Sequence, residues 1–170
     1  MSTLVADASA LVSLGIVAGD EPDPLALCLA RYDVLVPQAV IEELNEIASY
    51  DDVHGQAAAA VLDRTDTFTT TSVPLDAAFP LDDGENAAVT LANDRDAALL
   101  LCDEFTQLGL IHASVADTRL VTTPTLLSVL VRTDHLSPAD ARALLDQISD
   151  ARSWAANSYV QRARSLLEES

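Results

Sequence analysis

Short apolar segments that alternate with helical patterns constrain the fold of this chain most strongly. Thr3–Ala6, Val34–Val36 and Leu99–Cys102 are near-continuous apolar runs, typical of strands that are covered on both faces. Strands that alternate with helices in this way build a parallel sheet between two layers of helices. We therefore expect an α/β fold, a three-layer α/β/α sandwich with a central parallel sheet of roughly four to five strands.

The other segments extend this pattern over one domain, residues 1–170. Two more strands are expected, at Thr67–Val73 and Arg119–Thr122. Helices over about 137–168 are expected to pack on the domain, with Trp154, Tyr159, Leu166 and Leu167 either on the core or in a dimer face. The expected helices are Ala8–Val17, Leu25–Ala30, Gln38–Ser49, Gln56–Leu62, Asp82 through Leu91, Glu104–Ser114, a helix from Thr123-Pro124, a helix from the Ser137 N-cap to about Ser149, and Ser153–Glu168.

The charge balance is strongly acidic. The chain has 27 Asp and Glu against 9 basic residues, all of them Arg, and its net charge is −18. Such a surface is tolerable in concentrated salt, where the Debye length falls to about 3 Å at 1 M. We expect a halophilic, haloarchaeal source, with an acidic mesophilic protein as the alternative. The apolar runs are shorter than the ~18 residues of a membrane span, and no signal peptide is recognisable, which predicts a cytoplasmic protein.

Several chemistries are excluded by residues that the chain lacks. Without Lys it has no P-loop, no Schiff-base amine and no receiver-type phosphoacceptor site, and it has no Gly-x-Gly-x-x-Gly fingerprint for a dinucleotide. Cys28 and Cys102 are far apart in apolar surroundings, so we expect buried, reduced thiols. The histidines at 54, 112 and 135 do not cluster with them, which argues against zinc.

Four acids stand at the ends of strands or the beginnings of helices: Asp7, Glu43, Glu85 and Asp103. Each has an ordinary structural explanation, as a helix N-cap (Asp7, Asp103), as an acid in a first helical turn (Glu85) or as part of a solvated helix face (Glu43). An α/β fold can nevertheless bring strand ends together at one edge of the sheet. Converging carboxylates form a hard-oxygen site for Mg²⁺ or Mn²⁺.

Each of these acids lies in a short motif. Val5-Ala-Asp-Ala-Ser9 is an expected strand that ends in Asp-x-Ser, and it is similar to the opening strand of the PIN domain family, which ends in Asp-x-Ser/Thr. Pro37-Gln-Ala-Val-Ile-Glu-Glu-Leu44 resembles its Pro-x-x-Val-x-x-Glu-Leu helix, and Gly84-Glu-Asn-Ala-Ala88 resembles the Gly-Glu-x-x-Ala segment of one branch, that of VapC-like toxin ribonucleases. Leu99-Leu-Leu-Cys-Asp103 is similar to the strand that ends in Asp. The motifs follow in order over about Thr3 to Leu145.

The resemblance implies which residues form the site. Asp7, Glu43, Glu85 and Asp103 would be the catalytic residues and the ligands of Mg²⁺ (or Mn²⁺), with Ser9 supporting Asp7 or a water. Glu104 and Asp83 are second-rank candidates. Two positions depart from the pattern: Thr122 replaces a turn Gly, and Gln107 stands where an Arg often follows the fourth acid.

The implied function is metal-dependent endoribonuclease activity, in which a metal-activated water hydrolyses RNA phosphodiesters with one or two ions. The resemblance also suggests the toxin of a type II toxin–antitoxin pair, with RNA as substrate, a cognate antitoxin and a homodimer as partners, and no membrane association. Arg95 and Arg119 are candidates for RNA contacts. The alternatives are a catalytically weak PIN-like protein-binding or regulatory module, and an unrelated acidic α/β domain whose acids are caps and surface.

Overall fold

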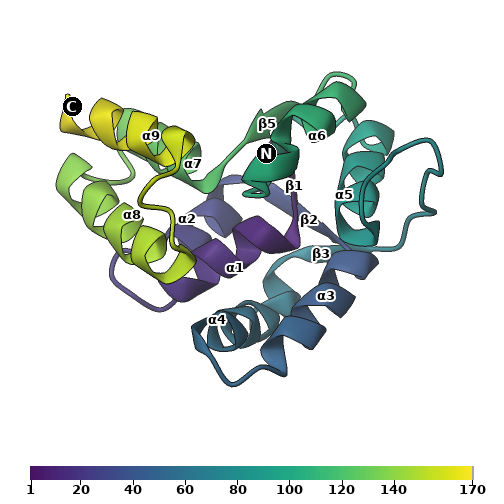
Figure 1. Ribbon diagram of the computed structural model, residues 1–170, viewed down its shortest axis with the longest axis horizontal. Coiled ribbons are helices and arrows are strands. Elements are labelled where there is room, and N and C mark those ends of the chain that lie inside the picture. The colour runs from purple at the N-terminus through teal and green to yellow at the C-terminus, as the bar shows by residue number, and fades with distance from the viewer. Residues whose placement is uncertain (170) are drawn as a thin grey trace.

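Five short strands form one parallel sheet at the centre of the molecule (Figure 1). The computed structural model describes residues 1–169, and within them the strand order is β3-β2-β1-β4-β5 with every neighbouring pair parallel. The predicted α/β sandwich with four to five parallel strands is confirmed. The strands are β1 (Thr3–Ala6), β2 (Asp33–Pro37), β3 (Thr69–Thr71), β4 (Leu99–Leu101) and β5 (Arg119–Val121).

Helices cover both faces of this sheet. Alternate strand residues point to opposite sides, so Val5 and Leu100 pack with α5 and α6, whereas Leu4, Ala6 and Leu101 pack with the remaining helical layer. None of the helices within the described residues is long and apolar enough to cross a membrane. The helices are α1 (Ala8–Ile16), α2 (Pro24–Arg31), α3 (Gln38–Ala48), α4 (Val53–Leu62), α5 (Asp83–Asp94), α6 (Leu108–Ser114), α7 (Thr123–Arg132), α8 (Pro138–Arg152) and α9 (Ser158–Glu168).

The strand order reverses direction between β1 and β4. From β1 the chain proceeds outward through β2 and β3, and it then returns to place β4 and β5 on the other side of β1. Ala6 lies opposite Leu101 in this pairing, so the residues that follow β1 and β4 emerge side by side. Ligands of open α/β sheets bind in the crevice that such a reversal leaves at the carboxyl ends of the strands.

Some predicted boundaries are wrong, for local reasons. The strand expected over Thr67–Val73 is restricted to β3, because Thr65–Thr67 forms a 3-10 turn. The helix expected over Glu104–Ser114 is a 3-10 turn at Phe105–Gln107 followed by α6, and the Phe105 amide bonds back to the Asp103 carbonyl at 2.9 Å.

Capping residues explain the other differences in helix length. α4 begins earlier than expected because the Asp52 carboxylate accepts the Gly55 amide at 2.8 Å. α8 continues to Arg152 and ends at Ser153, whose φ of 58° is left-handed, and α9 begins only after the N-cap Asn157.

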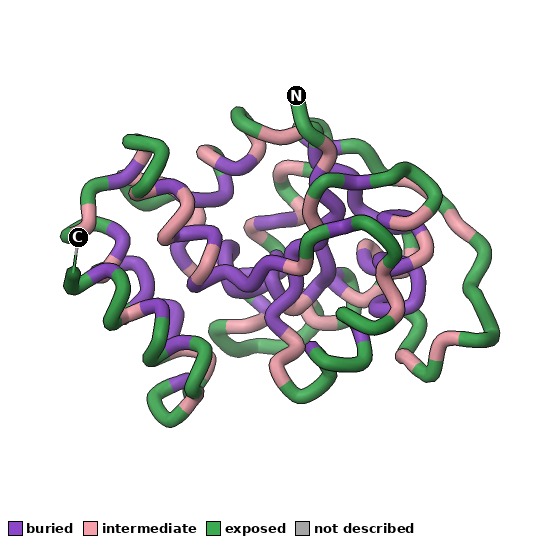
Figure 2. The backbone as a smooth tube through the Cα atoms, turned by 90° about the horizontal axis from the view of Figure 1, so that it is seen from above, coloured by how far each residue is buried: buried purple, intermediate pink, exposed green. Residues whose placement is uncertain are grey.

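The two C-terminal helices lie against the rest of the fold. α8 packs on α1 and α7, and α9 packs on α7 and α8, so these three helices form one end of the molecule (Figure 1). Trp154 and Leu167 are buried in the core, whereas Tyr159 and Leu166 are about half exposed, at 50% and 49%. Figure 2 shows the same division, with buried backbone in the middle of the molecule and exposed backbone on the outer turns of its peripheral helices. Of the four residues considered for a core or a dimer face, two therefore serve the core.

Both cysteines are buried free thiols, as expected from their apolar surroundings. Burial raises the pKa of Cys28 to about 12 and also raises the pKa of Cys102. Neither thiol is therefore a reactive thiolate at neutral pH.

The close approach of α1 to α4 generates the first prediction. A Cβ atom on Gly15 would lie 2.4 Å from the Ala57 carbonyl oxygen of α4, whereas a Cβ on Gly109 of α6 would meet nothing within 4 Å. We expect Gly15→Ala to destabilise the protein by about 2–3 kcal/mol, because the backbone of α4 cannot move aside cheaply. Thermal unfolding should show a loss of roughly 5–10 °C. Gly109→Ala should be neutral or slightly stabilising. An equal change in unfolding temperature for the two variants would contradict the close approach of α1 to α4.

Candidate active site

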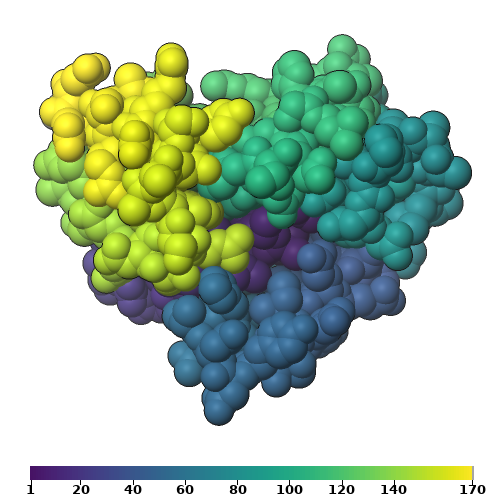
Figure 3. All heavy atoms as spheres, viewed as in Figure 1, coloured from purple at the N-terminus to yellow at the C-terminus, as the bar shows by residue number. Residues whose placement is uncertain are grey.

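An acidic cleft of about 390 Å³ lies at the carboxyl ends of β1 and β4, where the strand order reverses. Figure 3 shows the N-terminal segment, in purple, at the bottom of a hollow that is framed by blue, teal, green and yellow-green segments. The side chains that line the cleft come from five separate parts of the chain. Its charged residues include Asp7, Glu43, Asp82, Glu85, Glu104 and Arg152.

Asp7 is at the bottom of the cleft and is almost fully buried, with 4% of its surface exposed. Its Oδ2 accepts hydrogen bonds from the Ser9 hydroxyl at 3.1 Å and from the Cys102 thiol at 3.4 Å. It occupies the N-cap position of α1, yet its side chain makes no cap hydrogen bond, and its buried Oδ1 has no partner among the described residues. Burial raises the pKa of Asp7. The N-cap explanation therefore does not account for this carboxylate, whereas Ser9 does hold it in place.

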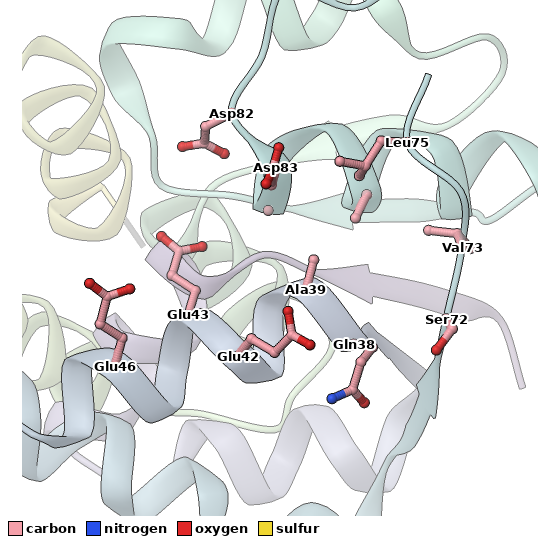
Figure 4. Close-up of a pocket in the computed structure, with 12 residues that line it drawn as sticks. Gln38, Ala39, Glu42, Glu43, Glu46, Ser72, Val73, Leu75, Asp82 and Asp83 are labelled. Atoms are coloured by element: carbon pink, nitrogen blue, oxygen red, sulfur yellow. The ribbon is translucent and has the colours of Figure 1, made fainter. Parts of the chain in front are cut away.

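Glu43 reaches the cleft from α3 through the space that is open because Gly84 has no side chain. A Cβ atom on Gly84 would lie 2.4 Å from Glu43 Oε2 and 3.8 Å from Asp7 Oδ1. In Figure 4 the Glu43 side chain points from α3 toward the beginning of α5, where Asp82 and Asp83 lie. Burial, followed by the negative charges of Asp7 and Asp82, raises the pKa of Glu43 to about 7.

Glu85 enters the same cleft from the first turn of α5 and is 8% exposed. Burial, followed by the charges of Asp82 and Asp7, raises the pKa of Glu85 to about 7. Asp82 caps α5, because its Oδ1 accepts the Glu85 amide at 2.8 Å, and it also faces the cleft. The sequence predicts Asp82 only as part of the run that opens this helix, so Asp82 is a residue of the cleft that the sequence analysis missed.

Asp103 takes a different place from the other three predicted acids. Its Oδ1 accepts the Thr123 amide at 2.7 Å, so it binds the first turn of α7, and its own amide donates to the Ser9 hydroxyl at 2.9 Å. It is 4% exposed, its pKa is raised by burial, and its Oδ2 has no partner within residues 1–169. The neighbouring Glu104 lines the cleft in its stead.

The two departures from the family pattern have local solutions. Thr122 forms an ordinary N-cap of α7 with φ −93° and accepts the Thr125 amide at 3.4 Å, so no glycine is required there. Gln107 lies in the 3-10 turn. The arginine that lines the cleft is instead Arg152, from the last turn of α8. Burial lowers the pKa of Arg152, and the charges of Asp103 and Glu104 act against this shift.

Arg152 could not be foreseen from local sequence. Its guanidinium lies 5.8 Å from the centroid of the Trp154 ring, which fixes it by a cation–π contact. To predict Arg152 as a residue of the cleft, one would need to know that the end of α8 lies at the carboxyl ends of the strands.

The other candidates lie outside the cleft. Asp83 is exposed and lines an adjoining groove of about 710 Å³, shown in Figure 4, which shares Glu43 and Asp82 with the cleft. Arg95 is exposed at the end of α5, and Arg119 lies on β5 in a separate pocket. These arginines are therefore not placed to contact a group bound between the acids.

The comparisons with known proteins agree with this architecture. A family model described as a PIN domain (DUF3368) matches residues 3–169. The chain belongs to the PIN domain family. The match extends beyond the motifs near Leu145 and includes α8 and α9. PIN domains are generally nucleases, which supports hydrolase activity on nucleic acids.

A solved structure supports the PIN fold independently. The structure resembles a PilT N-terminus domain protein from the hyperthermophilic archaeon Sulfolobus solfataricus P2, with a TM-score of 0.51 and 15% identity over 75% of this chain and 92% of that one. At this identity the likeness concerns the fold. No curated protein matches the sequence significantly.

The donor set of this PIN domain fits a hard divalent cation, the type of metal that PIN nucleases typically use. Within residues 1–169, no three His, Cys, Asp or Glu side chains already stand at the spacing of a bound ion. Asp7 nevertheless keeps a buried oxygen without a hydrogen-bond partner among these residues. Glu43 and Glu85 line the same cleft, and the pKa of each is raised. Buried polar atoms are otherwise almost always paired, so these oxygens fit a cation that the carboxylates would close on.

The raised pKa values generate a prediction on stability. A carboxyl whose pKa rises from 4.5 to about 7 on folding binds more protons in the folded state, so its contribution to stability falls as pH increases from about 4.5 to above 7. Glu43→Gln should therefore stabilise the metal-free protein at pH 8, because it removes a carboxylate that is unfavourable in the folded state. We expect a gain of about 1–2 kcal/mol, less than the full pKa shift would give, because the side chain is only half-buried and solvent screens its charge. Thermal unfolding in chelator should show a gain of roughly 3–6 °C at pH 8 and almost none at pH 4.

The matched control is Glu42→Gln, which removes the same charge from an exposed neighbour on α3. An equal gain from both variants would mean that net charge, rather than the cleft, sets the pH dependence.

The space at Gly84 generates a further prediction. Gly84→Ala should displace the Glu43 carboxylate while the helix itself forms normally, because Ala is favoured in helices. We expect divalent-cation affinity to fall by about tenfold or more, measured by calorimetry with Mn²⁺. Gly109→Ala, whose added methyl group meets open space, should leave the affinity unchanged. Unaltered Mn²⁺ binding by Gly84→Ala would show that Glu43 is not a ligand.

Proposed function

We propose that this PIN domain is an endoribonuclease that depends on Mg²⁺ or Mn²⁺ and hydrolyses RNA phosphodiesters at the acidic cleft. The observation that carries this proposal is the buried, unpartnered Oδ1 of Asp7 beside Glu43 and Glu85. Packing acids together with raised pKa costs folding free energy. A catalytically weak protein-binding module, the alternative function, would give no reason to keep acids that destabilise the fold.

The carboxylates have separate roles in the proposed site. Asp7, Glu43 and Glu85, which line the cleft, would hold the cation. Asp103 does not line the cleft, and it would join them only through Oδ2, its oxygen without a hydrogen-bond partner among the described residues. Ser9 and Cys102 keep Asp7 Oδ2 engaged, so that Oδ1 stays directed to the ligand. The adjacent acids Glu104 and Asp82 are the replacements to consider if Asp103 remains with α7.

When bound, the cation would neutralise the charge that develops on the phosphate and favour deprotonation of the attacking water. Glu43 and Glu85, with pKa values of about 7, carry protons part of the time near neutrality and must release them when they become ligands. Arg152 supplies the fixed positive charge of the cleft, at a position to contact a phosphate oxygen. A single guanidinium and a cation together offset the repulsion between RNA and the acids.

The biological setting is a separate proposal. Similarity to the Gly-Glu-x-x-Ala branch suggests the toxin of a type II toxin–antitoxin pair, acting in the cytoplasm of a halophile as a homodimer. A small antitoxin gene beside this one, whose product relieves growth arrest caused by the chain, would support the toxin role. Light scattering at high and low protein concentration tests the dimer.

Cleavage of single-stranded RNA tests the nuclease proposal. In molar KCl with Mn²⁺ or Mg²⁺ the wild type should cleave, and Asp7→Asn should lower the rate by about a thousandfold or more, because it removes the central ligand charge. Asp94→Asn, which removes an exposed acid at the far end of α5, should leave the rate unchanged. Equal rates for wild type and Asp7→Asn, or cleavage that persists in chelator, would refute the proposal.

A further inference from the structure

Three arginines line a second pocket that shares no residue with the acidic cleft. Arg119 on β5, Arg132 on α7 and Arg162 on α9 face a cavity of about 720 Å³. All three side chains are exposed. The chain has only 9 basic residues, so a third of them gather in this pocket.

These arginines have no protein partner in the described part of the chain. Arg64 pairs with Asp23 at 2.6 Å and Arg164 with Asp146, whereas the side chains of Arg119, Arg132 and Arg162 make no hydrogen bond or ion pair within residues 1–169. Glu169 is the one acid among the described residues that line the pocket. In a protein with 27 acids, three unpaired guanidinium groups in one cavity leave a local excess of positive charge available to an anion.

The remaining lining favours a specific kind of anion. The hydroxyl residues Thr125 and Ser128 lie on α7 beside Arg132, one helical turn apart. Thr125 accepts from the Thr122 hydroxyl at 3.2 Å and keeps its own hydrogen for a phosphate oxygen, whereas the Ser128 hydroxyl donates to the Pro124 carbonyl at 3.4 Å and would turn from it to reach a phosphate. Tyr159 is half exposed at the edge of the pocket, and its ring stacks on Phe105 with a centroid distance of 5.6 Å and an interplanar angle of 13°. An aromatic ring held in this way offers a platform for a nucleobase.

We propose that this pocket binds a phosphorylated nucleoside, with the phosphate between Arg119, Arg132 and Arg162 and the base against Tyr159. The ligand is either a free nucleotide or the terminal phosphate of an RNA chain, since both present the same chemistry. An acidic peptide fits less well, because it offers nothing for the tyrosine platform. The inference does not depend on the nuclease proposal, since none of its residues belongs to the cleft.

Calorimetric titration of the full chain in chelator, where a metal-dependent nuclease is silent, tests the proposal. AMP should bind in about 0.15 M KCl and adenosine should not, because the arginines hold the phosphate. Arg132→Ser should weaken AMP binding by about tenfold or more, and Glu169→Gln should strengthen it by removing the opposing charge. Tyr159→Leu should weaken AMP while leaving the binding of inorganic phosphate unchanged.

The matched control is Arg95→Ser, which removes one exposed arginine from the end of α5 and should leave AMP binding unaltered. A short oligouridylate with a 5′-phosphate, compared with its dephosphorylated twin, distinguishes the two sources: preference for the phosphorylated strand over AMP assigns the site to an RNA end, and the reverse assigns it to a free nucleotide. The proposal is overturned if adenosine binds as well as AMP, if Arg132→Ser binds like wild type, or if polyglutamate competes as well as AMP does.

Discussion

Burial of carboxylates at the strand reversal is the constraint on which the rest of the site depends. Removal from water raises the pKa of Asp7, Glu43 and Glu85, and the negative charge of Asp7 raises the pKa of Glu43 and Glu85 further. Without a counter-charge such an arrangement weakens the fold at neutral pH. The fold tolerates it because the surrounding apolar core is large and continuous on both faces of the sheet.

The same constraint explains the small residues and hydrogen bonds around the acids. The pairing of β1 with β4 brings Asp7 beside Cys102, and Ser9 bonds both to Asp7 and to the amide of Asp103. The missing side chain of Gly84 lets Glu43 reach the same point from α3. These contacts fix one oxygen of each buried aspartate and leave the other without a partner. A site that fixes half of its ligand atoms and leaves the other half free is preorganised for a ligand.

The sheet could be predicted from the sequence because apolar runs and their spacing follow local physics, whereas the family was predicted from the resemblance of the motifs around the acids. Three of the four predicted acids, Asp7, Glu43 and Glu85, line one cleft. Apolar runs that end in Asp predict strand ends, and parallel strands bring such ends together, as Asp7 shows. Arg152 and the orientation of Asp103 depend on where α8 and α7 pack, which no local pattern encodes. The boundaries failed where a cap or a 3-10 turn decided them, as at Asp52 and Phe105.

The distribution of positive charge ties the acidic surface to ligand binding. A protein with a net charge of −18 cannot attract an anion by its overall field, so any phosphate must be held by short-range contacts. The cleft offers Arg152 and carboxylates that suit a bridging cation, and the second pocket offers three unpaired arginines. A strongly acidic surface and the proposed binding of phosphates are therefore compatible in one small domain.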